Sequence, residues 1–91
     1  MLVYFKTSFF KDLKKLPSDT KREVRFICFT IFPKLHNGGH DLKRYDIKPI
    51  KGFKGYFRIR LGDYRVGFKM KDKSVEFMRV KHRKDIYKHF P

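Results

Sequence analysis

The sequence predicts an α+β fold in which two N-terminal helices pack on a mainly antiparallel sheet. Apolar residues recur at helical spacing between 7 and 32, whereas they alternate with polar residues between 56 and 80. Gly62 and Asp63 separate two of the alternating runs, as in a tight β-hairpin. Because helices precede hairpin strands, the two are expected to form separate layers. With 91 residues, we expect one domain over 1–91.

The chain begins with a predicted short strand and a first helix. Residues 1–5 are mostly β-branched and aromatic, which favours a strand. Thr7 or Ser8 can cap the helix that follows. The residues of its apolar stripe are Phe9, Phe10, Leu13 and Leu16. Residues 17–19 contain proline and serine, so we expect the chain to break there and start again.

A second helix is predicted to begin at a capping box. Thr20 and Glu23 have the spacing of that motif, and Pro33 is expected to end the helix. Its apolar face comprises Val24, Ile27, Cys28 and Ile31. Residues 33–48 are expected to form a loop centred on Gly38 and Gly39.

Three strands and a short helix are predicted for the second half. Residues 56–61 and 64–70 form the hairpin, and a turn at 71–73 leads to a strand over 74–80. Residues 84–90 are expected to form a short terminal helix. The predicted order is therefore β-α-α-β-β-β followed by a helix.

Charge points to a polyanionic partner. The chain has 24 Lys and Arg against 9 Asp and Glu, a formal net charge of +15. The excess is spread along the chain, because 1–45 has net charge +6 and 46–91 has +9. Such a field attracts polyanions, and nucleic acid is the expected partner. A generic basic surface or an anionic membrane is the other interpretation, although no basic amphipathic helix stands out.

Cellular location and cofactors follow from what the sequence lacks. One cysteine excludes an internal disulfide framework, and no signal peptide or spanning segment is visible, so we expect a cytoplasmic protein. His36, His40 and the distant Cys28 do not form a recognisable zinc set. Gly38 and Gly39 lack the ending of a phosphate loop. We therefore expect neither metal nor cofactor.

The predicted hairpin gathers arginines on one face. A two-residue turn at 62–63 sets Leu61 opposite Tyr64 and Arg60 opposite Arg65. The apolar face comprises Phe57, Ile59, Leu61, Tyr64, Val66 and Phe68, and the other face Arg58, Arg60, Arg65 and Lys69. Opposed like charges destabilise a strand pair, and no acidic residue alternates onto this face within the two strands. A phosphate suits it, because a guanidinium can donate two parallel hydrogen bonds.

The segment at 81–87 adds cations, an imidazole and a phenol. His82 is a candidate acid–base group, and Tyr87 can orient a group or exchange a proton. A lone histidine or tyrosine more often serves packing or the surface, but proximity to an arginine cluster makes a chemical role plausible for both.

Two segments resemble the RelE/ParE superfamily of toxins from type II toxin–antitoxin modules. Residues 48–66 are similar to the family's basic-apolar-basic strand followed by Gly-x-Tyr-Arg-Val. Residues 79–87 resemble the closing His-Arg-x-x-x-Tyr of the RelE branch. The predicted element order also agrees, over essentially the whole chain.

The resemblance implies a ribosome-dependent mRNA interferase. Such an endoribonuclease cleaves mRNA in the ribosomal A site and inhibits translation. The ribose 2′-OH attacks the adjacent phosphate, the 5′-oxygen leaves, and a cyclic phosphate can form. The resemblance also implies a cognate antitoxin with an acidic or amphipathic segment that wraps the toxin. Operator DNA would be bound only through the antitoxin complex.

The resemblance assigns candidate site residues. Arg65 and Lys81 are assigned to the scissile phosphate, and Tyr87 to orienting or deprotonating the 2′-OH or stacking on a base. Arg58 and Arg60 would stabilise transition-state charge or help protonate the leaving oxygen, and Arg83 matches a further basic position. RelE itself has lysines where Arg58 and Arg60 stand, and arginine is a poorer proton shuttle. His82 is therefore a candidate replacement, with His89 behind it. The expected RNA-binding lysines are Lys48, Lys51, Lys54, Lys69 and Lys84.

Two other functions remain open. A ParE-like toxin would keep the fold but inhibit DNA gyrase. A non-catalytic nucleic-acid-binding module would use the basic sheet face, with salt-sensitive binding and no cleavage.

Overall fold

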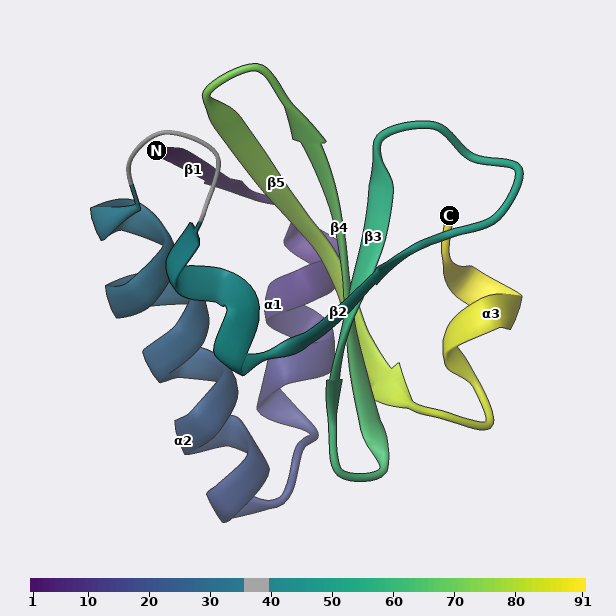
Figure 1. Ribbon diagram of the computed structural model, residues 1–91. Helices are drawn as coiled ribbons and strands as arrows, with labels where there is room; N and C mark the ends of the chain where they lie inside the picture. The colour runs from purple at the N-terminus through teal and green to yellow at the C-terminus, as the bar shows by residue number, and fades with distance from the viewer. Residues whose placement is uncertain (36–39) are drawn as a thin grey trace.

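The computed structural model describes residues 1–35 and 40–91, and it contains a five-stranded sheet in the order β1-β5-β4-β3-β2 (Figure 1). The strands are β1 (Leu2–Phe5), β2 (Asp46–Pro49), β3 (Tyr56–Leu61), β4 (Tyr64–Lys71) and β5 (Ser74–His82). The helices are α1 (Thr7–Lys14), α2 (Ser18–Phe26) and α3 (Ile86–His89). A π-helical segment (Ile27–Ile31) and a 3-10 turn (Phe32–Lys34) extend α2, and a 3-10 helix (His40–Arg44) precedes β2. β1 and β5 are parallel, and the other strand pairs are antiparallel.

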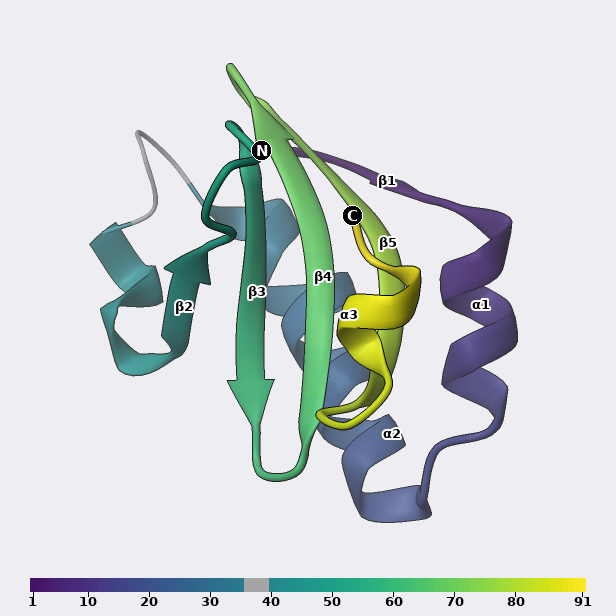
Figure 2. The same cartoon turned by 90° about the vertical axis from the view of Figure 1, so that its right-hand side faces the viewer.

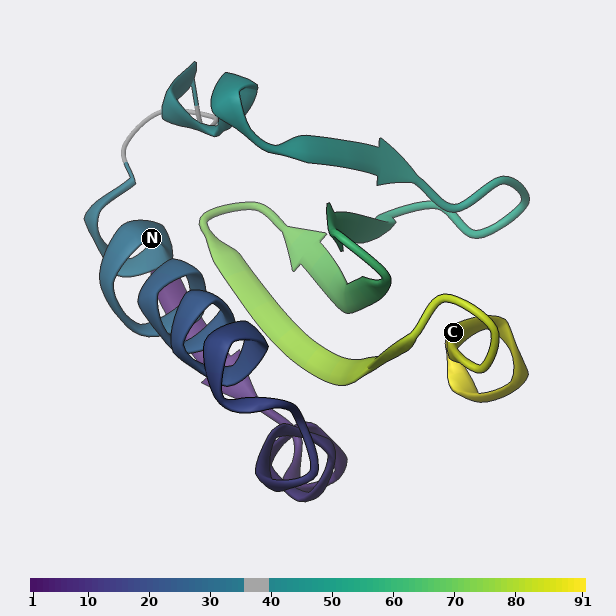
Figure 3. The ribbon, with the colours of Figure 1, turned by 90° about the horizontal axis from the view of Figure 1, so that it is seen from below.

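Helices lie on both sides of the sheet. α1 and α2 cover one face, and the short α3 lies over β4 and β5 on the other, as Figures 2 and 3 show. We call these the helix face and the open face. The core lies under α1 and α2, where the fully buried side chains include Phe9, Val24, Phe32, Phe68 and Phe77. Among the helices that the structure describes, none has both the length and the apolar character to cross a membrane.

The predicted helical stripes are confirmed, with one exception. Val24, Ile27 and Cys28 are buried, and burial raises the pKa of the Cys28 thiol well above its ordinary value. Phe9 and Leu13 are buried too, but Phe10 is exposed, with its ring against those of Phe5 and Phe29.

The predicted helix starts were wrong. α1 begins after Lys6, and α2 begins at Ser18 after Pro17, without a side-chain cap at either start. Thr20 and Glu23 therefore lie inside α2 rather than forming a capping box. Proline suits this start, since its missing N–H would be unpaired there anyway. At the other end, the helix passes Pro33 by tightening into the 3-10 turn.

The predicted loop over 33–48 contains an unpredicted strand. β2 pairs with β3, so that Asp46 faces Arg60 and Ile47 faces Ile59. The strand has four residues, and only Ile47 packs against the core. Its alternation was therefore too short to distinguish from a loop. His36, Gly38 and Gly39 lie outside the described residues.

The hairpin register is confirmed. Leu61 faces Tyr64, Arg60 faces Arg65, and Ile59 faces Val66. Between β4 and β5 the register shifts after Gly67, because Gly67 faces Arg79 while Phe68 faces Phe77. Met78 is therefore the extra residue of a β-bulge.

Side chains of α1 complete the edge of β5 beyond this bulge. β1 accompanies β5 only as far as Phe77. Past that point the Ser8 hydroxyl donates to the Met78 carbonyl at 2.8 Å, and an Asp12 carboxylate oxygen accepts from the Val80 N–H at 3.2 Å. Ser8 and Asp12 are four residues apart and so share a helix face. α1 thus takes over the hydrogen bonds that a longer β1 would have supplied.

Gly67 makes room for the C-terminal segment on the open face. The Phe90 side chain lies over this glycine and is 2% exposed. A Cβ added at position 67 would come within 2.6 Å of the Phe90 ring. The close approach fixes where the chain after α3 can lie.

Gly67→Ala should therefore destabilise the fold by about 1–3 kcal/mol, because the new methyl group overlaps a buried ring. Chemical denaturation of Gly67→Ala, Phe90→Ala and the double variant tests the contact. The cost of Gly67→Ala should fall sharply when position 90 is already alanine. Equal costs in both backgrounds would contradict this packing.

Candidate active site

Cations from three neighbouring strands form a row on the open face. Arg60 of β3 faces Arg65 of β4, and Arg65 faces Lys81 of β5. Directly opposed residues share one face and lie about 4.5–5.5 Å apart at their Cβ atoms. The row therefore extends the predicted Arg60–Arg65 pair by a third cation.

A carboxylate lies at each end of this row. On the β2 side, Arg58 Nη1 donates to the Asp46 carboxylate at 3.2 Å and to its backbone carbonyl at 3.0 Å. The hydrogen bond from Arg58, helped by the charges of Lys48 and Arg60, holds the pKa of Asp46 below its ordinary value. The prediction that the two hairpin strands place no acidic residue on this face is confirmed. The carboxylates come instead from the neighbouring elements, Asp46 from β2 and Asp12 from α1.

Asp12 is the carboxylate at the other end, and it is 5% exposed. Arg79 donates to both of its oxygens, at 2.8 and 3.1 Å, and Lys81 Nζ lies 3.3 Å from Oδ1. Burial would raise the pKa of Asp12, but the bonds from Arg79 and Val80 and the nearby cations outweigh it and lower the pKa. Asp12 is therefore an ionised anchor and is unsuited to act as a base.

Arg65 lies at the centre of the cations. Its Nη1 donates to the carbonyls of Gly62 and Tyr64, at 2.8 and 3.0 Å. Partial burial, then the charges of Arg60, Arg58 and Arg83, lower its pKa, and the Tyr87 phenol opposes them. Within the described part of the chain, Arg65 has no carboxylate within ion-pair distance. An anion bound here would relieve the repulsion.

Arg83 and Tyr87 reach the cluster from the segment after β5. The Arg83 N–H donates to the Asp63 carbonyl at 2.7 Å, which holds this segment against the hairpin turn. The Arg83 guanidinium lies 3.6 Å from the exposed Asp63 carboxylate. Tyr87 is on α3 and is 59% exposed. Five of the predicted residues, Arg58, Arg60, Arg65, Arg83 and Tyr87, are thus electrostatic neighbours.

His82 lies on the other face of the sheet. It faces Tyr64 in the register, and the two rings meet edge-on with centroids 5.4 Å apart. Its Nδ1 accepts a hydrogen bond from the Lys84 N–H at 3.2 Å. Since Tyr64 packs against the core, the structure separates His82 from the arginines and contradicts its placement beside them. His89 is exposed on the last residue of α3.

The predicted RNA-binding lysines surround the open face without meeting at one point. Lys48 faces Arg58 from β2, and Lys69 Nζ lies over the Tyr56 ring at 5.3 Å. Lys51 and Lys54 are exposed between β2 and β3, and Lys84 is exposed after β5. They enlarge the basic surface around the row.

Asp12 and Asp46 were missed by sequence reasoning. The spacing of Phe9, Asp12, Leu13 and Leu16 places Asp12 on the buried side of α1, and this signal could have found it. A carboxylate on an apolar stripe needs a buried partner. Asp46 could be found only once β2 was known.

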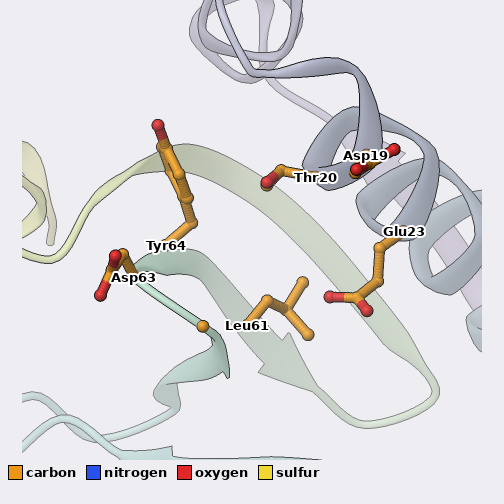
Figure 4. A pocket seen from close by; sticks show the side chains of 7 residues that line it. Asp19, Thr20, Glu23, Leu61, Asp63 and Tyr64 are labelled. Atoms are coloured by element: carbon orange, nitrogen blue, oxygen red, sulfur yellow. The ribbon is translucent and has the colours of Figure 1, made fainter.

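A separate hollow on the helix face has acidic walls. Asp19, Thr20 and Glu23 of α2 lie across it from Leu61, Gly62, Asp63 and Tyr64 of the hairpin, as Figure 4 shows. Across residues 1–35 and 40–91, no group of three or more His, Cys, Asp and Glu side chains is arranged to hold a metal ion. The basic row and this hollow are on opposite faces, since Leu61 and Tyr64 pack towards the core.

Comparisons with known proteins point to toxins. A family model described as ParE toxin of type II toxin-antitoxin system, parDE, matches residues 3–87. Toxin RelE3 of Methanocaldococcus jannaschii is 42% identical over 91 residues, which is 100% of both chains. A chain of the RelB–RelE antitoxin–toxin complex from Methanococcus jannaschii is 35% identical, with a TM-score of 0.78 over 97% of this chain and 99% of that one. A chain of the RelBE2 complex from Mycobacterium tuberculosis is 30% identical, with a TM-score of 0.67 over 92% of each chain.

Asp12→Ala should destabilise the chain by about 1–3 kcal/mol, because it leaves the Val80 N–H and two partly buried cations without their acceptor. Asp12→Asn keeps an acceptor and should cost less. Asp19→Ala, which removes an exposed carboxylate, serves as the control and should change stability by less than about 0.5 kcal/mol. Urea denaturation measures all three.

The pH dependence gives a second readout of the same carboxylate. The pKa of folded Asp12 lies below its ordinary value of 3.8. Its stabilisation is complete above the unfolded pKa and is lost as the pH falls through the folded one. Asp12→Asn should therefore make stability fall less steeply below about pH 4. An unchanged acid limb would show that folding does not lower the pKa of Asp12.

Proposed function

This chain belongs to the RelE/ParE superfamily of toxins from type II toxin–antitoxin systems, and we propose that it is a ribosome-dependent mRNA interferase. The observation that supports the activity most is the position of Arg65. It lies between Arg60 and Lys81 in the row, within electrostatic reach of Arg83 and Tyr87 and without a carboxylate partner in the described residues. A phosphodiester is the anion that this surface suits best.

The proposed reaction is transesterification. The 2′-oxygen attacks the adjacent phosphorus and gives up its proton, the bond from phosphorus to the 5′-oxygen breaks, and that oxygen takes up a proton. The products are a 2′,3′-cyclic phosphate and a 5′-hydroxyl. Arg65 and Lys81 would bind the non-bridging oxygens of the scissile phosphate. Tyr87 would orient the 2′-OH or receive its proton.

The two remaining strand arginines differ in their freedom. Arg58 is committed to Asp46, whereas Arg60 is exposed. Arg60 is therefore the better candidate to stabilise the negative charge that develops on phosphorus. The Lys81 ammonium is tied to Asp12 but has three donors, so it can still contact a phosphate. His82 is left out of the mechanism because it lies on the helix face.

Dependence on the ribosome follows from what this surface offers. It supplies positive charge and one phenol, and the carboxylates at the ends of its row, Asp12 and Asp46, are ionised partners of cations. The Asp63 carboxylate is exposed and lies beside Arg83. Positioning of the 2′-OH in line with the leaving oxygen would then come from the A site. Efficient cutting of free mRNA would contradict this part of the proposal.

The partner that would restrain the toxin is an antitoxin. The similar structures from Methanococcus jannaschii and Mycobacterium tuberculosis are toxin–antitoxin complexes by name. We propose a RelB-like antitoxin for this chain, with an acidic or amphipathic segment that wraps the +15 surface. Exposed rings on the outside of α1, α2 and the π-helical segment, namely Phe10, Phe26 and Phe29, would suit the apolar side of such a segment. Operator DNA would be bound through the antitoxin complex.

Inhibition of DNA gyrase is the second candidate function. The family model that matches residues 3–87 carries the description of the ParE toxin, and ParE-like toxins inhibit gyrase. The two functions make opposite predictions for mRNA in a translating extract. Non-catalytic binding of nucleic acid would give salt-sensitive retention without cleavage.

Primer extension on a defined mRNA in a reconstituted translation reaction tests the activity. The protein should cut at codon positions only when ribosomes are present. Arg65→Ala should slow cutting by about 10²–10³-fold, because it removes a donor that stabilises phosphate charge. Tyr87→Phe should slow it by about 10²-fold if the phenol moves a proton.

The matched control is Arg22→Ala, which removes an exposed arginine on α2, far from the row. It should cut at the wild-type rate. Intact message with and without ribosomes would overturn the interferase proposal, and gyrase supercoiling would then be assayed.

A further inference from the structure

The connection between β2 and β3 holds an aromatic ring in solvent. Phe53 is 51% exposed. Its own N–H donates to the Ile50 carbonyl at 3.1 Å, and its carbonyl accepts from the Tyr56 N–H at 3.1 Å. The Ile50 N–H donates in turn to the Tyr56 carbonyl at 2.8 Å. The ring is thus carried by a closed, hydrogen-bonded turn.

Two glycines and a bond to β4 fix this turn. Gly52 and Gly55 both have φ near +85°, a conformation that other residues adopt only with strain. The Gly55 carbonyl accepts from the Met70 N–H at 2.9 Å, and a Cβ at position 55 would lie 3.3 Å from the Met70 carbonyl. The backbone around Phe53 is therefore specified in detail, although its ring has little to pack against.

The surroundings of the ring are cationic and aromatic. Lys51 and Lys54 flank Phe53 in the chain, and no Asp or Glu occurs between residues 47 and 62. The Tyr56 ring lies edge-on to Phe53 with centroids 6.3 Å apart, and Lys69 covers Tyr56. Phe53 is thus one exposed ring between two lysines, with the partly buried Tyr56 beside it. An exposed ring among cations is the combination that binds single-stranded nucleic acid, since every base can stack and every phosphate is negative.

The loop is continuous with the candidate active site. Tyr56 shares the open face with Arg58 and Arg60, because alternate residues of β3 point the same way. Four residues of strand separate Tyr56 from Arg60, which is about 13 Å. The Phe90 ring lies over Gly67 of β4 with its centroid 5.9 Å from that of Tyr56. A single strand bound at the row would therefore extend towards Phe53 along the β2 side of β3, past Arg58 and Lys48.

We propose that Phe53, with Lys51 and Lys54, forms a stacking subsite for a base of single-stranded RNA beyond the cut. This inference rests on the proposed RNA substrate but not on cleavage. The position of the ring favours RNA over the antitoxin segment, because Phe53 lies on the same strand connection that leads into Arg58 and Arg60, whereas the exposed rings proposed for the antitoxin, Phe10, Phe26 and Phe29, belong to the helix layer.

A single tryptophan can report on this site, since the chain has none of its own. The probe is a ten-nucleotide 2′-O-methyl oligouridylate, which cannot be cut because its 2′-oxygen is blocked. Phe53→Trp should show saturable fluorescence quenching as bases stack on the indole. Phe26→Trp is the matched control, because Phe26 is 52% exposed on α2, and it should show little quenching.

An abasic oligomer of the same length separates stacking from charge. It should bind through its phosphates and leave Phe53→Trp fluorescence nearly unchanged. Phe53→Ala should bind the oligouridylate at least about five-fold more weakly, and Phe53→Tyr should restore binding. Low salt, near 20 mM, keeps the phosphate contribution to binding strong.

Three results would overturn the subsite. The first is equal quenching of Phe26→Trp and Phe53→Trp, and the second is equal quenching by abasic and base-bearing oligomers. The third is an affinity for the oligouridylate that Phe53→Ala leaves unchanged, and wild-type protein that does not bind the oligouridylate at all counts as this result. Loss of antitoxin binding in Phe53→Ala with RNA affinity intact would instead assign the ring to a protein partner. Quenching without ribosome-dependent cleavage would leave the subsite standing while the interferase proposal failed.

Discussion

Repulsion among Arg60, Arg65 and Lys81 is the constraint on which the open face depends. The register of β3, β4 and β5 sets these three cations side by side, and like charges directly opposed destabilise a sheet. The fold compensates at the two ends, where Asp46 pairs with Arg58 and Asp12 binds Arg79 and Lys81. Arg65 in the middle bonds only to backbone carbonyls among the described residues. The compensation therefore leaves one position where an external anion would be stabilising.

The same contacts connect the helix layer to the open face. Asp12 belongs to α1, whose hydrophobic side packs in the core, yet its carboxylate holds two cations of β5. On the other side of the sheet, the Phe90 ring packs closely over Gly67 and holds the end of α3 against β4, and α3 carries Tyr87. A phosphate on Arg65 would then lie among Lys81, which is held by Asp12, the exposed Arg60 and the Tyr87 phenol. Shape and charge at this position suit a phosphodiester.

Sequence reasoning succeeded where structure is local. A two-residue turn and strict alternation fix the hairpin, so the facing of Arg60 and Arg65 could be counted from the sequence. It missed β2, because four residues with one core side chain carry almost no periodicity. The role of Asp12 could not be predicted, because it depends on contacts between segments far apart in the sequence. β1 pairs with β5 only as far as Phe77, which leaves the rest of that edge of β5 to α1. The prediction that His82 lies beside the arginines was wrong. Alternation from the buried Val80, two residues earlier, puts His82 on the helix face, so the sequence contained the signal that would have corrected it.

We propose that the open face, and not the helix layer, receives RNA phosphate at Arg65. Side-chain Nε–Hε resonances of ¹⁵N-labelled arginine, followed during titration with the uncleavable 2′-O-methyl oligouridylate, test this most directly. We expect the resonances of Arg60, Arg65 and Arg83 to shift. Those of Arg22 and Arg25 on α2, and that of Arg79, which is held by Asp12, should stay in place. Shifts confined to the α2 arginines, with Arg60 and Arg65 unmoved, would contradict it.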